Sequence, residues 1–445
     1  MQIIFIDGEC SYDEQTSNLI IQVFELIRNV LEDLPDQSIH LEINELITKI
    51  LFDETLHNIL TSTQFDEQIS EYLLADKDAI FKCPKCLQYA INNGVEINDD
   101  TLINILKNKS SKCIQCIKIM KDNGYKLPEN SCSVAVDYGN TEFLKYAHEN
   151  GCWWNEEICR DAASCGHLEC LKYAHKNGCH WNKSTCTHAA INGHLECLKY
   201  AHENGCPWNE LTCDYAAYRG HLECLKYAHE NGCIWNQTIC FKAAMKGHLE
   251  CLKYAHENDC SWNEKICCIA ASCGHLECLR YAHENGCSWN EFTCYHAAEY
   301  GQLECLKYAH ENGCSWNEKI CSNAARNGYL ECLKYAHENG CKWNEETCGN
   351  AASNGYLECL KYAHENGCPW DELICSRAAE NGQLECLKYA HENGCMWNKY
   401  VCCNAVGWGH LECLRYAHEN DCPYDKTELL NCSNKLCVEY IEKFM

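Results

Sequence analysis

The chain has 445 residues, 43 of them cysteines, and a formal net charge of -27 at pH 7. This acidity argues against a nucleic-acid backbone or an anionic membrane surface as the main partner, because both are themselves negative. The sequence has no apolar run of about 18 residues, so we expect no transmembrane helix. The start of the chain lacks a basic segment followed by a long apolar stretch, which favours the reducing cytoplasm.

The N-terminal segment differs from the rest of the chain. Its first 80 residues contain 17 acidic and three basic side chains. Apolar residues recur at helical spacing over 18–33 and 40–62, which predicts a small helical segment over 1–81. The apolar residues around and after Leu34-Pro35 faintly resemble the F-box, a helical module that docks onto cullin-type ubiquitin ligases. Residues 1–81 are therefore either a cap or a docking region.

A 27-residue unit recurs through most of the remaining chain. Its second half reads His-Leu-Glu-Cys-Leu-Lys-Tyr-Ala-His-Glu-Asn-Gly-Cys between His194 and Cys206. Weaker copies at 86–94 and 116–124 precede it, and Tyr424 replaces the usual Trp near the end. A repeat of this kind predicts a stack in which each unit is buried by its neighbours. We expect this array to span residues 82–445, with degenerate first and last repeats.

One unit contains signals for two helices. Asn209 is a good N-cap and Gly220 a natural C-terminal stop, so a first helix is predicted between them. A second helix is predicted from about His221 to Asn231. The unit has no alternating strand pattern of useful length. These features predict an all-α solenoid of short antiparallel helices.

The cysteines and tryptophans follow the repeat. Thirty-two of the 43 cysteines fall in three series that begin at Cys132, Cys152 and Cys170. We interpret them as reduced core residues, with a disulfide ladder as the alternative. One Trp per unit, from Trp154 to Trp397, is predicted to insert between layers as the largest buried side chain.

The consensus resembles the ankyrin repeat, whose second helix typically follows the pattern Gly-His-Leu-Glu. The match begins, for example, at Ala189 with Ala-Ala-x-x-Gly-His-Leu-Glu. The unit is shorter than the roughly 33 residues usual in that family, and the missing residues fall where ankyrin repeats project a β-hairpin. The resemblance implies an ankyrin-type helical-repeat solenoid with shortened hairpins. The short form rich in Asn-Gly-Cys-x-Trp-Asn-Glu is also similar to ankyrin paralogue sets of giant DNA viruses of amoebae and some protists, which implies a host cytoplasm.

Two cysteine pairs have the spacing of a zinc site. They are Cys83 with Cys86 and Cys113 with Cys116, each pair separated by two residues. Since Cys86 and Cys116 also belong to the repeat frame, ordinary core packing is the preferred interpretation, and no cofactor is expected.

Other candidates for chemistry recur in every layer, whereas a catalytic site is singular, so we do not expect an enzyme. The His before each second helix, such as His194, is one such residue. By the ankyrin resemblance, it is expected to hydrogen-bond a neighbouring turn.

The places where copies differ indicate a binding surface. Between Ala-Ala and Gly, two positions vary from layer to layer and include residue types favoured at interfaces. By the ankyrin resemblance, this end of the first helix borders the concave face. The partner-binding candidates are Tyr218, Arg219, Met245, Lys246, Glu299, Tyr300, Arg326 and Trp408. The alternative is that these are merely tolerant surface sites.

We therefore expect a non-enzymatic scaffold that binds a protein partner through the concave face. The alternative function is the substrate-recognition subunit of a cullin-type ubiquitin ligase, recruited through residues 1–81. In that case host ubiquitin-ligase components are further partners.

Overall fold

The computed structural model describes residues 84–445 except 93, 95, 108–112 and 431–433. All regular elements in these ranges are α-helices, so the predicted all-helical class is confirmed there. The chain divides into two compact units, Met1–Trp181 (unit 1) and Asn182–Met445 (unit 2). The boundary expected after residue 81 and the F-box interpretation both concern residues outside the described ranges and stay predictions.

Unit 1 begins, in its described part, with the two weak repeat copies. Its helices are α6 (Pro84–Asn92), α7 (Asp99–Lys107), α8 (Cys113–Asp122), α9 (Ser131–Asp137), α10 (Thr141–Glu149), α11 (Glu157–Cys165) and α12 (Leu168–Lys176). Helices α6 and α8 pack against each other and are followed by Gly94 and Gly124 at positive φ, 89° and 94°. The weak copies therefore do form second helices, as their frame indicated.

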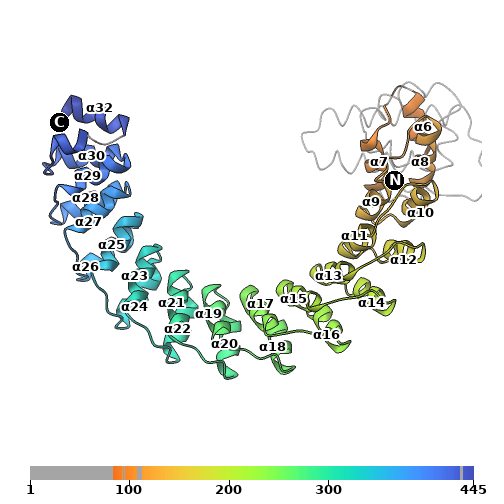
Figure 1. Cartoon of the computed structure of the whole chain (residues 1–445), viewed down its shortest axis with the longest axis horizontal. Helices are drawn as coiled ribbons and strands as arrows, with labels where there is room; N and C mark the ends of the chain where they lie inside the picture. Colours follow the sequence, from red (N-terminus) through yellow and green to blue (C-terminus); the bar gives the residue numbers. More distant parts are fainter. Residues whose placement is uncertain (1–83, 93, 95, 108–112, 431–433) are drawn as a thin grey trace, which may run out of the picture. The chain divides into compact units, whose positions relative to one another are not determined.

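Unit 2 alternates first helices, with odd numbers, and second helices, with even numbers (Figure 1). The first helices are α13 (Lys183–Ile191), α15 (Glu210–Arg219), α17 (Thr238–Lys246), α19 (Lys265–Ser272), α21 (Glu291–Glu299), α23 (Lys319–Arg326), α25 (Glu345–Asn354), α27 (Leu373–Glu380) and α29 (Tyr400–Trp408). The second helices are α14 (Leu195–Glu203), α16 (Leu222–Glu230), α18 (Leu249–Glu257), α20 (Leu276–Glu284), α22 (Leu303–Glu311), α24 (Leu330–Glu338), α26 (Leu357–Glu365), α28 (Leu384–Glu392) and α30 (Leu411–Glu419). Two closing helices follow, α31 (Lys426–Leu430) and the predicted terminal helix α32 (Lys435–Phe444).

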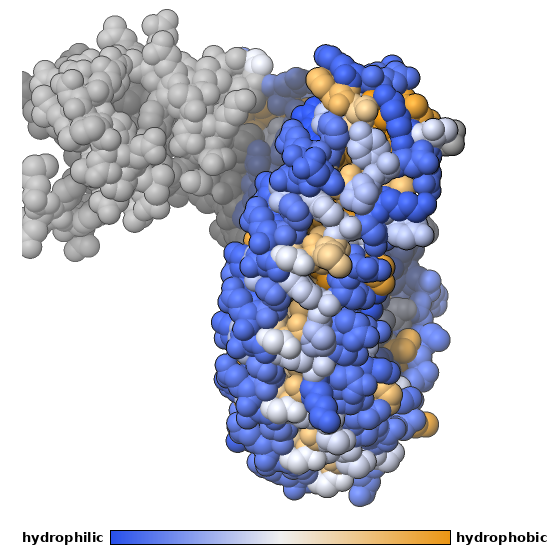
Figure 2. All heavy atoms as spheres, turned by 90° about the vertical axis from the view of Figure 1, so that its left-hand side faces the viewer, coloured by the Kyte–Doolittle hydropathy of each residue, from blue (hydrophilic) through white to orange (hydrophobic). Residues whose placement is uncertain are grey.

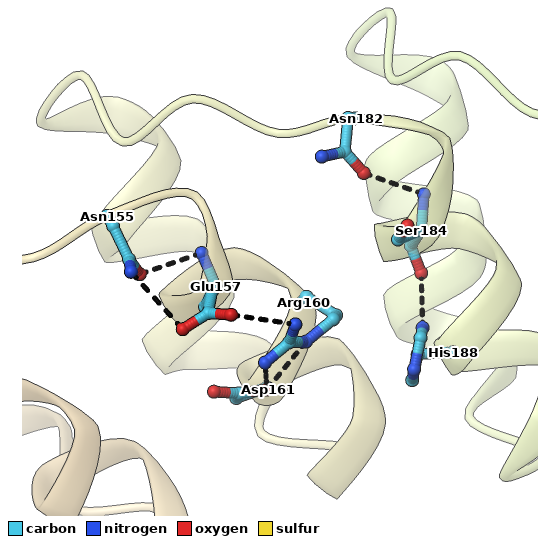
Figure 3. Close-up of polar contacts among 7 residues, drawn as sticks. All are labelled: Asn155, Glu157, Arg160, Asp161, Asn182, Ser184 and His188. Carbon is cyan, nitrogen blue, oxygen red and sulfur yellow. Dashed lines mark hydrogen bonds and ion pairs between the residues drawn. The ribbon is translucent and has the colours of Figure 1, made fainter.

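Asparagine side chains begin several first helices. In unit 2, Asn182 Oδ1 accepts a hydrogen bond of 2.8 Å from the Ser184 amide, and His188 Nδ1 lies 2.8 Å from the Ser184 carbonyl (Figure 3). In unit 1, Asn155 Oδ1 likewise accepts from the Glu157 amide at 2.9 Å (Figure 3). Asn209 occupies the predicted N-cap position of α15, but its side chain makes no capping hydrogen bond.

The glycine after each first helix is required by the backbone and by the next layer. Gly220 caps α15 in the left-handed region, at φ 78°, where a side chain is strained. A Cβ at this position would also lie 2.5 Å from Nδ1 of His248. His248 Nε2 in turn lies 3.1 Å from the Tyr218 carbonyl. This contact confirms that the recurring His bonds a neighbouring turn.

Small side chains let the first helices of unit 2 approach closely. Cys213, Ala216 and Ala217 of α15 are fully buried, as are Leu225 and Ala228 of α16. Neighbouring first helices consequently share more extensive contacts than neighbouring second helices. Within unit 2 the stack therefore curves with the first helices on its inner side (Figure 1).

Three aromatic rings join consecutive repeats. His229 stacks on Trp235 with ring centroids 3.7 Å apart, and Tyr254 of the next repeat meets Trp235 edge-on at 5.9 Å. His229 Nδ1 also lies 3.1 Å from the Tyr254 hydroxyl. The prediction that Trp is the largest buried side chain is wrong, because each of these tryptophans is only half-buried. The Trp covers the His ring from the loop and keeps part of its own surface in solvent.

The three cysteine series occupy core positions, as predicted. With the exception of the half-buried Cys152, their members are buried free thiols. Burial is the main reason that the pKa of Cys224 is raised to about 12. At neutral pH the Cys224 side chain therefore acts as a small apolar residue.

The side of the C-terminal layers seen in Figure 2 is mostly hydrophilic, and its apolar residues form small separate spots. None of the described helices combines the length and the apolar character that crossing a bilayer requires.

Candidate functional site

The predicted binding residues all lie at the C-terminal ends of first helices in unit 2 or directly after them. Their side chains are exposed or half-buried. The most exposed aromatic ones are Trp408, 68% exposed, and Tyr300, 53% exposed. The prediction therefore points to one face, the inner face of the curved stack in unit 2, which we call the first-helix face.

A cationic and aromatic cluster lies where α15 meets α17. Lys246 Nζ is 4.8 Å from the centroid of the Tyr218 ring, and the Arg219 guanidinium carbon is 5.9 Å from it. Cations at these distances are attracted by the ring face. No ion pair joins Arg219 or Lys246 to a carboxylate in the described part of the chain. Both charges are thus available to a partner.

Beside this cluster, Asp214 holds the same two helices together. It is only 5% exposed and is the one buried carboxylate among the described residues. Asp214 Oδ1 accepts a 2.8 Å hydrogen bond from the Thr238 hydroxyl, and Oδ2 pairs with the Lys242 ammonium. Lys242 Nζ also lies 5.5 Å from the Tyr215 ring centroid. These residues lie outside the two variable positions before each glycine, so variation at those positions does not reveal them.

A second cluster, on α21, consists of aromatic side chains. Phe292 is 51% exposed and Tyr300 53%. The ring of His296 lies between them, with centroids 6.3 Å from Phe292 and 6.4 Å from Tyr300. Glu299 is engaged locally, since its Oε2 lies 3.0 Å from His296 Nδ1. The signal that we missed here is helical spacing, because Phe292, His296 and Tyr300 recur every four residues.

The structure does not gather all predicted residues into one site. Tyr218, Arg219 and Lys246 form the first cluster, while Glu299 and Tyr300 belong to the second. Met245 is half-buried, and its carbonyl accepts from His275 Nε2 at 3.1 Å. Two predicted residues belong to neither cluster and lie on later repeats. Arg326 ends α23 and contacts Asn350 of α25, and Trp408 ends α29.

The acidity of unit 2 is concentrated on the second helices. Each even-numbered helix from α14 to α30 contains two glutamates and one lysine or arginine. That cation pairs with the glutamate three residues earlier, as Lys253 does with Glu250 at 2.9 Å. The first helices from α13 to α29 instead carry eight basic and seven acidic residues in total. The first-helix face is therefore close to neutral beside an acidic outer face.

The histidines bordering the first cluster do not add to its charge at neutral pH. Burial lowers the pKa of His221 and of His248 below their usual value of 6.5, although a backbone hydrogen bond opposes this shift in each. The positive charge of the cluster consequently comes from Arg219, Lys246 and the paired Lys242.

The proposed zinc cysteines are only partly described. Cys113 and Cys116 are buried in α8, and Cys113 Sγ accepts from Asn140 Nδ2 at 3.3 Å. Burial raises the pKa of Cys113, which disfavours the thiolate that zinc requires. Cys83 and the side chain of Cys86 lie outside the described residues, and the described ones contain no group of three or more His, Cys, Asp or Glu that could hold a metal ion. The zinc interpretation stays a prediction.

Comparison with known proteins identifies the repeat. Family models described as ankyrin repeats match residues 186–229, 213–293 and 240–320. Among solved structures, the crystal structure of the human ASB11 ankyrin repeat domain is similar, with a TM-score of 0.32 and 22% identity over 35% of this chain and 84% of that chain. No curated protein matches the sequence. The 27-residue units over 186–320 are therefore ankyrin repeats, of a form that is short and all-helical.

Proposed function

We propose that the chain is a non-enzymatic scaffold that binds a protein partner through the first-helix face of unit 2. Ankyrin repeats are a general protein-interaction fold, and this unit contains them. The main observation behind the proposal is that the residues that differ from repeat to repeat are concentrated on one face of an otherwise uniform array. Exposed Tyr300 and Phe292, and the unpaired cations Arg219 and Lys246, all lie there.

The outer face supports this choice by contrast. The second helices repeat nearly the same nine residues, so each presents the same glutamates, lysine and histidine to solvent. Their lysines are already paired with glutamates, as Lys307 is with Glu304 at 2.9 Å. A surface that is identical in every layer offers a partner no preferred position, whereas the first-helix face differs from layer to layer.

The test removes one aromatic ring from each cluster. We expect Tyr218→Ala with Tyr300→Ala to weaken binding of a partner, recovered with the full chain and identified by mass spectrometry, by about tenfold or more, since buried aromatic anchors dominate interface energies. Titration calorimetry measures the affinity, and circular dichroism confirms unchanged helicity. Lys253→Ala with Lys307→Ala on the outer face is the matched control. Unchanged affinity in the first variant would count against this face.

A second function follows from the acidic N-terminal segment. In this alternative, residues 1–81 recruit a cullin-type ubiquitin ligase through the F-box-like pattern near Leu34-Pro35, and the repeats select the substrate. Purification with the full chain is compared with purification using residues 82–445. Cullin-ligase components that are lost with residues 1–81 would support this function, and their absence from both samples would contradict it. In either function we propose the cytoplasm as the place of action, that of a host if the chain is viral.

A further inference from the structure

The pair of layers formed by α15 and α17 differs from the other pairs in unit 2. At the position of Asp214, the other first helices carry threonine, serine, cysteine, glycine or an aromatic residue. An ion pair with one buried member, such as Asp214 with the half-buried Lys242, adds little net stability, because the cost of taking charge out of water offsets the attraction. Its occurrence in a single layer pair therefore points to a local role in positioning side chains.

The pairing determines which cations stay free. Asp214 neutralises Lys242 and draws it toward α15, so the remaining cations of this cluster are Arg219 and Lys246. These two occupy equivalent positions in consecutive repeats, and both lie near the Tyr218 ring. The other acidic residue of the two helices, Glu210, lies at the opposite end of α15. The C-terminal ends of α15 and α17 are thus a small positive area on a protein with net charge -27.

The same row of positions continues to the aromatic cluster. Tyr300 is the counterpart of Lys246 two repeats further along and of Arg219 three repeats further along, and the half-buried Cys273 lies at the corresponding place after α19. Packed helices are spaced by about 8–10 Å, so α17 and α21 are roughly 16–20 Å apart. An extended peptide covers this distance with about six residues, at about 3.3 Å per residue.

We infer that the first-helix face from α15 to α21 binds an extended acidic peptide segment of its partner. Carboxylates of the segment meet Arg219 and Lys246, and an apolar or aromatic side chain about six residues away packs on Phe292 and Tyr300. This inference rests on the proposed function and specifies the partner's chemistry. Glu299 fixes the orientation, because it disfavours placing the acidic end of the segment at α21.

The charge distribution of unit 2 supports an acidic rather than a basic segment. A basic segment would be attracted to the second helices, each of which carries an excess of acidic residues, and would have no preferred layer. An acidic segment is repelled by that outer face and attracted by the cluster that contains the unpaired cations Arg219 and Lys246. Repulsion from incorrect surfaces of this kind contributes to specificity.

The experiment uses the full chain and a fluorescein-labelled peptide, acetyl-Glu-Glu-Glu-Ser-Gly-Ser-Gly-Leu-Trp, in a fluorescence anisotropy titration at low salt. We expect Arg219→Glu with Lys246→Glu to weaken binding at least tenfold, and Phe292→Ala with Tyr300→Ala to weaken it by a similar factor. The matched control reverses two charges on the outer face, Lys253→Glu with Lys307→Glu, and should leave the affinity within about twofold. Replacing the three glutamates of the peptide by glutamine, or raising the salt concentration to screen them, should also weaken binding at least tenfold.

Absence of binding to the wild-type chain would overturn the inference, as would equal losses in the outer-face control. The inference would also be overturned if a peptide with phosphoserines in place of the three glutamates bound more than tenfold more tightly than the glutamate peptide. The two proposals fail separately. Binding of a recovered protein partner could be weakened by Tyr218→Ala with Tyr300→Ala and yet be unaffected by salt and by charge reversal at Arg219 and Lys246. That result would support the scaffold function and contradict binding of an acidic segment.

Discussion

His202 lies flat on Trp208, with ring centroids 3.6 Å apart and planes inclined by 9°. Tyr227 of the following repeat meets both rings edge-on and places its hydroxyl 3.2 Å from His202 Nδ1. Near the end of the chain Tyr424 replaces the Trp, and it meets His418 edge-on at 6.0 Å instead of stacking. The aromatic contacts therefore connect each repeat to the next through its loop.

Removing one of these tryptophans should weaken the junction between two repeats. Trp235→Ala deletes the stack on His229 and the edge contact with Tyr254, and we expect a loss of about 2 kcal/mol, moderated because Trp235 is only half-buried. Urea unfolding followed by circular dichroism measures this loss. The control is Ile234→Ala in the same loop, since Ile234 is 80% exposed. Equal effects of the two changes would show that the stack contributes no stability.

Stability should fall as the pH drops below about 6.5. Burial lowers the pKa of His221 and His248 in the folded chain from their ordinary 6.5, so the unfolded chain binds protons more readily. The stability that the two neutral histidines contribute is fully present above pH 6.5. It is lost as the pH falls from 6.5 through the lower pKa that they have in the folded protein. Thermal melts between pH 8 and pH 5 measure this decline.

The chain itself suggests the control for this pH dependence. Gln302 occupies the place of His248 two repeats further along, and against Gly274 it makes the same close approach. His221→Gln with His248→Gln should therefore preserve the fold and make the decline below pH 6.5 shallower, while His175, His202 and His229, whose pKa burial also lowers, still contribute to it. An identical pH profile in this variant would exclude these two histidines as its cause.

The ion pair between the buried Asp214 and the half-buried Lys242 should show strong coupling between its members. Asp214→Asn leaves the Lys242 ammonium, 27% exposed, without its carboxylate, and we expect a loss of about 2–3 kcal/mol. Lys242→Met in the same chain should recover part of that loss. A double-mutant cycle by urea unfolding gives the coupling energy. Additive effects would mean that the two side chains do not interact. The exposed pair of Glu250 with Lys253 is the comparison, and Glu250→Gln should change stability little.

Alkylation should separate core thiols from surface thiols. Cys224 and Cys251 are buried, and burial raises the pKa of each to about 12, so we expect neither to react with iodoacetamide in the native protein at pH 8. Among the cysteines whose side chains the structure describes, the exposed Cys165 should react first. Peptide mapping by mass spectrometry measures modification at each site, with urea-unfolded protein as the fully reactive control. Uniform modification in the native state would contradict the core assignment.

Much of the local structure of unit 2 could be predicted from the repeat. Asn209, Gly220 and Asn231 mark the predicted helix ends, and the structure places α15 and α16 between them. The burial of Trp235 could not be predicted, because a loop residue leaves no periodic pattern from which to judge how much of its ring stays in solvent. The packing partner, His229, is only visible once the loop is known to fold back along the preceding helix.

The candidate site was predicted in part. Tyr218 and Lys246 were found from variation between copies, which needs no knowledge of packing. Asp214 and Lys242 were missed because 28 residues separate them, one repeat and one position, and their contact depends on how neighbouring helices lie against each other. The ring positions on α21 were visible in the sequence and would have been found by projecting each first helix onto its exposed face.

The distance between the two clusters of the first-helix face is a whole number of layers. Because the rings and caps of a repeat contact only adjacent repeats, gaining or losing one 27-residue unit between α17 and α21 would leave those contacts intact on both sides. Such a gain or loss would nevertheless lengthen or shorten the distance between the cationic and aromatic clusters by the spacing of one repeat. Unequal recombination within such a gene therefore changes the length of the ligand that fits without altering any residue that touches it.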